Sequence, residues 1–311
     1  MINKKIIIFG ATGTIGHPLT QELINRGYLI TVVSQNITNA KQVLPNVTQF
    51  KEWNYNQDEG ELIETISDGY AIINLSGVSI ASKRWNPKVL KLIEDSRILT
   101  TQKIVNVIKQ VQGKPSILLN ASSIGYYGFD KVTSELITEE SSNEDDSWTL
   151  DKKWEYEAMN AKQFGVRVVT MRTSFVLERS SNGALSKLLL PFKLFVGGPI
   201  MPYKYYRPWI HIDDEVGLWV FALENENVKD GLNCTSPTPV TNIEFARIIG
   251  HVMHRPSFIP IPSFLLRIVV GKVFVILTQV KRMVPKKAIE LGYKFKYVNL
   301  KEALDDIVKP V

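Results

Sequence analysis

The sequence predicts an α/β protein with a Rossmann-type, doubly wound parallel sheet and a smaller C-terminal substrate-binding lobe. Short apolar strands alternate with amphipathic helices, and a glycine-rich turn joins the first strand to the first helix. The first strand, Lys5 to Phe9, is a β-branched run typical of strands that are buried on both faces. Further strands are expected at 28–33, 70–75, 116–120 and 166–171, and helices at 19–26, 97–108, 152–164 and 300–307.

The turn after the first strand predicts a nicotinamide dinucleotide site. It reads Gly10-Ala-Thr-Gly13-Thr-Ile-Gly16. Gly10 allows a tight turn, Gly13 lets the backbone approach a pyrophosphate, and Gly16 lets helix and strand pack closely. The N–H groups at the start of the helix then face the phosphates. The alternative is a glycine-rich turn that binds nothing. The expected contacts are Gly10, Thr12, Gly13, Thr14, Ile15 and Gly16.

The end of the second strand predicts which cofactor binds. NAD-selective sites place Asp or Glu there, where the carboxylate accepts from the ribose 2′-hydroxyl. This chain has Ser34-Gln35-Asn36 instead, with Lys41 a little further on. NADP is therefore favoured over NAD, with Ser34 and Gln35 as contacts, although the arginine usual in NADP sites is missing. The alternative is a polar loop without a ligand.

Composition and charge limit the classes of protein to consider. With 311 residues, 44% of them hydrophobic, the chain can form one large domain or two modest ones. A net charge of +6 without a basic arm or run argues against nucleic-acid binding. The single cysteine, Cys234, excludes an internal disulfide and suits a cytoplasmic protein, and no metal site is expected.

The apolar stretch from Ser263 to Gln279 is the only one that suggests a membrane helix. Arg267 and Lys272 interrupt it, so no uncharged run approaches the length that a bilayer requires. We expect no membrane span, but a buried or interface-forming helix from Phe264 to Leu277, which would permit a homodimer.

The order of motifs resembles a known family. The chain resembles the extended short-chain dehydrogenase/reductases, and within them the atypical nucleoside-diphosphate-sugar epimerase-like proteins with a C-terminal domain of unknown function. The pieces that carry this resemblance are Gly10–Gly16, Asn74-Leu-Ser-Gly77, Lys83-Arg84-Trp85, Ser96-Arg97, Asn120–Gly128, Trp154-Glu155, Gly165–Arg172, Pro191-Phe192, Arg207-Pro-Trp-Ile-His-Ile-Asp-Asp214, Asn233, Pro239–Asn242 and Val284-Pro-Lys286.

The resemblance implies roles for residues at the ends of two strands, where doubly wound sheets bind ligands. Ser123 stands in the place of the catalytic serine, four residues before Tyr127, and its hydroxyl would hydrogen-bond a substrate oxygen. The alternative is that the serines there merely satisfy backbone groups. The residues expected to line the cofactor are Asn74, Leu75, Ser76, Gly77, Ala121 and Ser122.

The resemblance also places substrate contacts in the second half of the chain. Arg207, Trp209 and His211 belong to a strand that borders the substrate pocket in the family. Arg207 could bind an anionic substrate. For His211, a pocket contact and a structural pairing with a carboxylate are equally open.

One departure from the family affects the catalytic base. Members use Tyr-x-x-x-Lys, in which the tyrosine transfers a proton. Here Trp148 stands in the tyrosine's place and cannot do so, while Lys152 keeps the place of the lysine and could touch the nicotinamide ribose. Tyr126 and Tyr127 are substitutes, of which Tyr127 is our candidate; ring packing is the alternative for both.

Two functions follow. The first is an NADP(H)-dependent oxidoreductase or epimerase that acts on a small, sugar-like molecule. The second is a non-catalytic NADP(H)-responsive sensor or interaction module, which the missing tyrosine would permit. In either case residues 1–174, with contributions from 207–235, would form the NAD(P)-binding domain. Residues 175–311 would form mainly the substrate lobe and a family-specific C-terminal segment.

Overall fold

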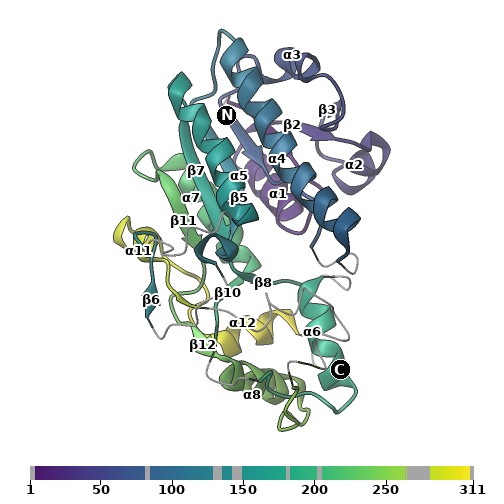
Figure 1. Ribbon diagram of the computed structural model, residues 1–311, viewed down its shortest axis with the longest axis vertical. Coiled ribbons are helices and arrows are strands. Elements are labelled where there is room, and N and C mark those ends of the chain that lie inside the picture. Colours follow the sequence, from purple (N-terminus) through teal and green to yellow (C-terminus); the bar gives the residue numbers. More distant parts are fainter. Residues whose placement is uncertain are drawn as a thin grey trace.

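A seven-stranded parallel sheet forms the centre of the computed structural model, in the order β11-β7-β5-β4-β1-β2-β3 (Figure 1). Its strands are β1 (Lys5–Phe9), β2 (Leu29–Ser34), β3 (Gln49–Glu52), β4 (Ala71–Asn74), β5 (Ile117–Ser123), β7 (Arg167–Thr173) and β11 (Asp230–Cys234). The expected Rossmann-type fold is confirmed. The structure describes residues 4–80, 85–128, 135–141, 149–179, 183–201, 205–262, 264 and 281–308.

Helices cover both faces of the sheet because successive strand residues point to opposite sides. Ile6 and Ile8 of β1 face one hydrophobic layer, and Ile7 and Phe9 face the other. The first layer holds α1 (Gly16–Asn25), α2 (Ile37–Val43) and α7 (Ile212–Glu224). The second holds η1 (Glu59–Leu62), α3 (Ile63–Ile66), α4 (Pro87–Gln110), α5 (Leu150–Met159) and η3 (Asn160–Phe164).

A second group of elements packs around its own core in the C-terminal half (Figure 1). Leu189 and Phe192 of one helix meet Phe245 and Ile249 of another there, and Leu304 of the last helix packs against them. This last helix has the bounds that the sequence predicts. The elements are β8 (Phe175–Leu177), α6 (Ala184–Lys193), β9 (Tyr206–Arg207), β10 (Trp209–His211), β12 (Val240–Thr241), α8 (Asn242–Met253) and α12 (Leu300–Ile307).

Three short elements link the two halves: β6 (Leu136–Ile137) pairs with β13 (Arg282–Met283), and α11 (Lys286–Glu290) follows. The helix expected from Phe264 to Leu277 lies outside the described residues beyond Phe264, as do Lys83, Arg84 and Trp148. Within the described part of the chain, no helix is long and apolar enough to cross a bilayer.

Two strands and one helix start differ from expectation. The partly exposed β3 lacks the apolar run that marks a buried strand, and β11 contains Gly231 and a buried asparagine. Helix α4 begins at Pro87 rather than Arg97, because Asn86 caps its N-terminus and proline fits the first turn.

Candidate functional site

The glycine-rich turn lies at the point where the strand order reverses, between β1 and β4. Gly10 has φ +78°, and a Cβ atom there would lie 2.6 Å from the Leu75 carbonyl oxygen, so only glycine fits between the two loops. A Cβ on Gly16 would lie 2.2 Å from the Gly10 carbonyl oxygen, so the start of α1 packs directly on the turn. Gly13 and Thr14 are exposed. The Gly13 N–H donates to the Gly10 carbonyl at 3.1 Å and closes the turn, which leaves an exposed surface at the start of α1, where doubly wound folds bind a dinucleotide's phosphates.

The end of β2 is polar and lies beside the start of α2. Ser34 Oγ accepts from the Asn36 N–H at 3.2 Å, and Asn36 Oδ1 caps the helix by accepting from Asn39 N–H at 2.9 Å. The parallel register places Glu52 of β3 opposite Ser34. The sequence alone does not show that Glu52 and Ser34 are neighbours, because only the pairing of β2 with β3 brings them together.

Asn74 takes part in a fully buried network rather than pointing outward. Its Nδ2 donates to Thr101 Oγ1 at 2.9 Å and to Asn120 Oδ1 at 2.7 Å, and its Oδ1 accepts from the backbone and the hydroxyl of Ser76. The side chain thereby ties the loop that follows β4 to β5. Only the backbone and side chains beyond it, from Leu75 to Gly77, remain to contact a ligand.

Arg97 of α4 contacts the same loop, which follows β4. Its Nη1 donates to the Val78 carbonyl at 3.0 Å, and its guanidinium lies 5.1 Å from the Trp154 ring. A Cβ on Gly77 would lie 3.0 Å from this guanidinium, so the loop rests directly on it. The sequence pattern Ser96-Arg97 is thus explained as loop support, because Ser96 Oγ also accepts from the Val78 N–H at 3.0 Å.

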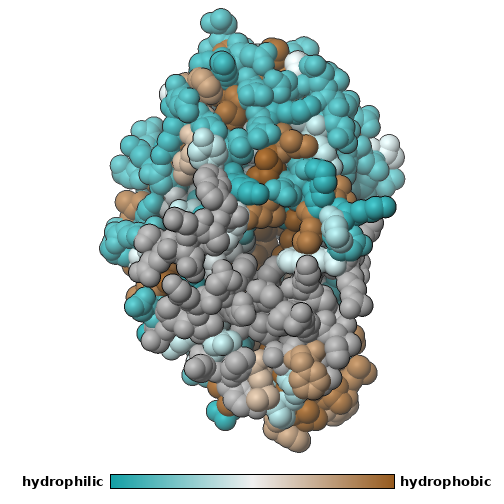
Figure 2. Space-filling view, in the orientation of Figure 1, coloured by the Kyte–Doolittle hydropathy of each residue, from teal (hydrophilic) through white to brown (hydrophobic). Residues whose placement is uncertain are grey.

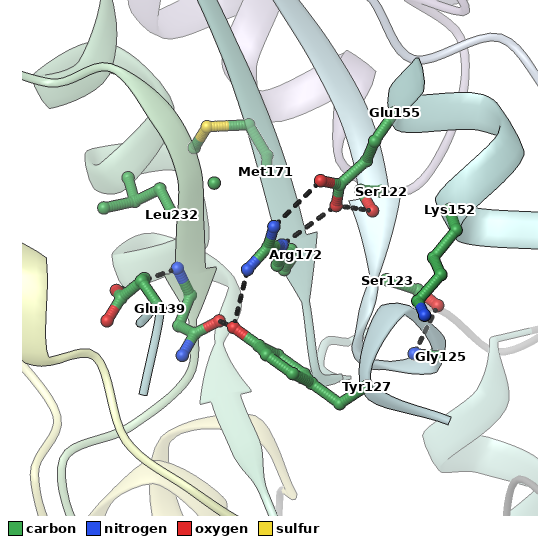
Figure 3. A network of polar contacts seen from close by, with 12 residues as sticks. Ser122, Ser123, Gly125, Tyr127, Glu139, Lys152, Glu155, Met171, Arg172 and Leu232 are labelled. Atoms are coloured by element: carbon green, nitrogen blue, oxygen red, sulfur yellow. Dashed lines mark hydrogen bonds and ion pairs between the residues drawn. The ribbon is translucent and has the colours of Figure 1, made fainter. Parts of the chain in front are cut away.

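A buried ion pair joins β5, α5 and β7 below the ends of the strands (Figure 3). Arg172 Nε and Nη2 each donate to Glu155 at 2.9 Å, and Ser122 Oγ donates to the same carboxylate at 2.6 Å. Ser122, Glu155 and Arg172 are all about 5% exposed or less. Ser122 therefore has a structural partner, and its hydroxyl points away from solvent.

Tyr127 belongs to this network and does not fit the catalytic role expected of it. Its hydroxyl accepts from Arg172 Nη1 at 2.8 Å and donates to Asn233 Oδ1 at 2.7 Å, and the residue is 2% exposed (Figure 3). Burial raises its pKa to about 12, the opposite of what a proton-transferring phenol needs. We therefore remove Tyr127 from the candidate catalytic residues.

Ser123 has a partner that the sequence interpretation missed. It caps η2 (Ile124–Tyr127) by accepting from the Gly125 N–H at 3.0 Å, and it also hydrogen-bonds the carboxyl group of Asp151. A Cβ on Gly125 would lie 2.1 Å from Asp151 Oδ2 and 3.2 Å from Ser123 Oγ, which places the two groups side by side. Figure 3 shows the Lys152 side chain pointing toward Ser123 from α5.

Asp151 is half-buried, and its burial raises the pKa of the carboxyl to about 6, against the hydrogen bond from Ser123 and the charge of Arg97. A carboxyl with this pKa exists in both protonation states near neutral pH, as a general acid or base requires. Asp151 stands three residues after Trp148. The Tyr-x-x-x-Lys pattern does not include this position. Aspartate is nevertheless a residue type that can transfer a proton, and this was the one signal for it in the sequence.

Trp209 and His211 are buried, which does not fit the substrate contacts expected of them. Trp209 is fully buried and donates to the Thr238 carbonyl at 3.2 Å. His211 is 1% exposed, caps α7 by accepting from Asp213 N–H, and lies 3.2 Å from Asp306 Oδ2. The structural alternative for His211, pairing with a carboxylate, is the one that the geometry supports.

Arg207 is also buried, at 4% exposure. Its Nε donates to Asn242 Oδ1 at 3.1 Å, its guanidinium lies 5.2 Å from the Phe245 ring, and burial lowers its pKa to about 10.

The structure brings together the glycine turn, Leu75 to Gly77, Ser123, Asp151 and Lys152, and leaves Trp209 and His211 in the core. Among the described residues, no three His, Cys, Asp or Glu side chains gather as metal ligands would.

Solved structures with a similar fold include proteins crystallised with nicotinamide cofactors. Human epimerase family protein SDR39U1 (isoform 2), crystallised with NADPH, superposes with a TM-score of 0.83 at 29% identity, over 97% of this chain and 98% of that one. UDP-glucuronic acid 4-epimerase from Bacillus cereus, in complex with UDP-glucuronic acid and NAD, has a TM-score of 0.75 at 17% identity, over 97% of both chains, and so shares the fold.

Sequence comparison extends the likeness to whole chains. Epimerase family protein SDR39U1 homolog, chloroplastic, from Arabidopsis thaliana is 32% identical over 98% of this chain and 86% of its own length. Epimerase family protein YfhF from Bacillus subtilis is 32% identical over 97% of each chain. Residues 261–307 match a domain of unknown function, DUF1731. Residues 6–234 match the NAD dependent epimerase/dehydratase family, and the chain therefore belongs to that family.

Proposed function

We propose that the protein is a cytoplasmic NADP(H)-dependent oxidoreductase or epimerase that acts on a hydroxyl or carbonyl group of a small, sugar-like molecule. One observation carries the proposal: a hydroxyl and a carboxyl group, Ser123 and Asp151, lie hydrogen-bonded at the carboxyl end of β5. In doubly wound sheets this edge is where ligands bind, and the glycine turn after β1 lies at the same edge.

The chemistry of these groups suits proton transfer. Ser123 Oγ would donate to the substrate oxygen, with the Gly125 N–H fixing its position. In a reduction, Asp151 in its acid form would pass its proton through Ser123 to that oxygen, and in an oxidation the carboxylate would receive it. The bound nicotinamide supplies or accepts the hydride. Lys152, which points toward Ser123, would place a positive charge beside the ribose (Figure 3).

This arrangement favours an enzyme over a non-catalytic sensor. The missing Tyr-x-x-x-Lys is the reason to consider a sensor, and the buried Tyr127 does not replace it. Asp151 provides a titratable group in hydrogen-bond contact with the serine.

NADP is the proposed cofactor because β2 ends in Ser34 and is followed by Gln35 and Asn36, without a carboxylate of its own, and because the human relative was crystallised with NADPH. Replacing Ser34 with aspartate would place a negative charge where the 2′-phosphate binds. At about 5 Å this repulsion amounts to a few kcal/mol, so the dissociation constant for NADPH should rise about 10- to 100-fold while that for NADH stays within about threefold.

Fluorescence titration of Ser34→Asp with both cofactors measures this change. Ser34→Asn has nearly the same shape without the charge and serves as the matched control. If Ser34→Asp bound NADPH as tightly as the control, the 2′-phosphate would not lie at the end of β2.

A substrate screen tests the reaction itself. NADPH oxidation and NADP⁺ reduction are followed with carbonyl compounds, sugars and nucleotide sugars, using wild type and Ser123→Ala. We expect turnover with at least one class and a loss of about 10²-fold or more in Ser123→Ala. No NADPH oxidation or NADP⁺ reduction with any compound, or a Ser123→Ala variant with the wild-type rate, would count against the proposal.

A further inference from the structure

An exposed apolar patch lies at the far end of the C-terminal half, over the end of α6 and the loop after α8 (Figure 2). Large apolar side chains normally avoid such exposure, and a contiguous group of them marks an interaction site. The patch, as we use the term, consists of Leu190 (54% exposed), Leu194 (63%), Phe195 (57%), Val196 (51%), Phe258 (78%) and Ile259 (37%).

Backbone pairing holds the two loops of the patch together. Ile200 and Ile261 form a parallel bridge, Ile261 N–H donates to the Pro199 carbonyl at 2.9 Å, and Met201 N–H donates to the Ile261 carbonyl at 3.0 Å. Phe195 has φ +61°, a conformation that costs free energy for a residue with a side chain. The Arg255 guanidinium lies 4.6 Å from its ring. The chain thus presents the phenylalanine outward in a fixed place.

The segments that build the patch carry only one sign of charge. Residues 183–201 contain Lys187 and Lys193 and no Asp or Glu, and residues 245–262 contain Arg247 and Arg255 and none. Lys187 and Lys193 of α6 are exposed. An apolar surface within cationic segments is complementary to an anionic, partly apolar surface.

We propose that this patch docks the protein reversibly on an anionic lipid bilayer. Shallow insertion of apolar side chains together with attraction of Lys and Arg to acidic headgroups is how peripheral proteins bind membranes without spanning them. A second copy of the chain fits less well, because a two-fold contact through this patch would bring Lys193 and its cationic neighbours against their own copies.

Co-sedimentation with vesicles tests the proposal on the full-length protein. Vesicles of phosphatidylcholine alone are compared with vesicles that contain about one-third phosphatidylglycerol. We expect binding to the anionic vesicles only, with a partition coefficient that falls about tenfold or more in about 0.5 M salt. Leu194→Ser should reduce it about tenfold, and Lys193→Glu at least about fivefold.

Matched controls lie on the sheet half of the molecule. Leu29 is 52% exposed at the start of β2, so Leu29→Ser removes a comparable apolar side chain elsewhere. Lys109→Glu makes the same charge reversal on α4, where Lys109 is exposed. Three results would overturn the proposal. They are no binding to anionic vesicles, equal binding to neutral and anionic vesicles, and a loss of binding in the control variants as large as in the patch variants. A dimer in sedimentation velocity that Leu194→Ser dissociates, without vesicle binding, would assign the patch to self-association instead.

Discussion

Replacing Asp151 with asparagine is expected to lower kcat about 10²- to 10⁴-fold, the usual contribution of a positioned general acid or base. Asparagine keeps the size of the side chain and can still accept from Ser123, but it cannot donate or receive the proton. NADPH affinity should stay within about twofold, since the carboxyl acts on the substrate oxygen through Ser123. Steady-state kinetics with a substrate from the screen, together with a cofactor titration, measures both quantities.

The pH dependence separates a catalytic carboxyl from a structural one. In the reductive direction the acid form is required, so kcat/KM should be flat below pH 6 and fall above it, because the pKa of Asp151 is raised to about 6. In the oxidative direction it should rise through the same pH. Asp151→Asn should lose this dependence. Glu157→Gln, further along α5, should keep it, and an Asp151→Asn variant with half the wild-type rate would refute the role.

The same raised pKa predicts that Asp151→Asn folds well. The folded protein holds the proton up to about pH 6, whereas the unfolded chain releases it near the ordinary aspartate pKa. Ionisation therefore favours the unfolded chain as the pH rises through this window, and the full cost is present above pH 6. Above this pH the variant should be at least as stable as wild type, so a lower kcat cannot be ascribed to unfolding.

Removing Glu155 by substitution to alanine is expected to lower the free energy of unfolding by about 3–5 kcal/mol. Glu155 accepts two hydrogen bonds from Arg172 and one from Ser122, and both charged side chains are about 5% exposed. Without the carboxylate, the guanidinium stays buried with Tyr127 as its remaining neutral partner in this network. Urea denaturation of wild type and Glu155→Ala gives the difference.

Two comparisons make this result specific. The double variant Glu155→Ala/Arg172→Met removes both charges and should recover much of the lost stability, because the cost arises from an unpaired buried charge. Lys153→Ala, which breaks the exposed pair between Lys153 and Glu94, should change stability by less than about 0.5 kcal/mol. A Glu155→Ala variant that loses under about 1 kcal/mol would show that the pair contributes little.

The parts of the fold that depend on local sequence were predictable. The glycine turn is specified by residues within one strand–loop–helix unit, and α12 by its own apolar spacing. Strand β5 was predictable as an element, although it runs to Ser123 rather than to Asn120, and Ser123 was singled out by the family resemblance. Strand β3 was not, because its partly exposed residues lack the apolar pattern and its pairing with β2 is a tertiary contact.

The roles of several site residues required long-range contacts. Tyr127 meets Asn233, and His211 meets Asp306, each about a hundred residues away in the chain. Both contacts turn a candidate site residue into a buried structural one, and no spacing rule reveals them. For Asp151, by contrast, a long-range contact creates a candidate site residue. Its partner Ser123 lies on another element, and only the packing of α5 on β5 brings the two together.

Titration of the protein with NADPH, followed by nicotinamide fluorescence, tests NADP(H) binding at the glycine turn most directly. We predict saturable binding with a dissociation constant in the micromolar range or tighter, and affinity for NADH that is at least about tenfold weaker. No saturation up to about millimolar NADPH, or equal affinity for the two cofactors, would contradict the assignment of this site to NADP(H).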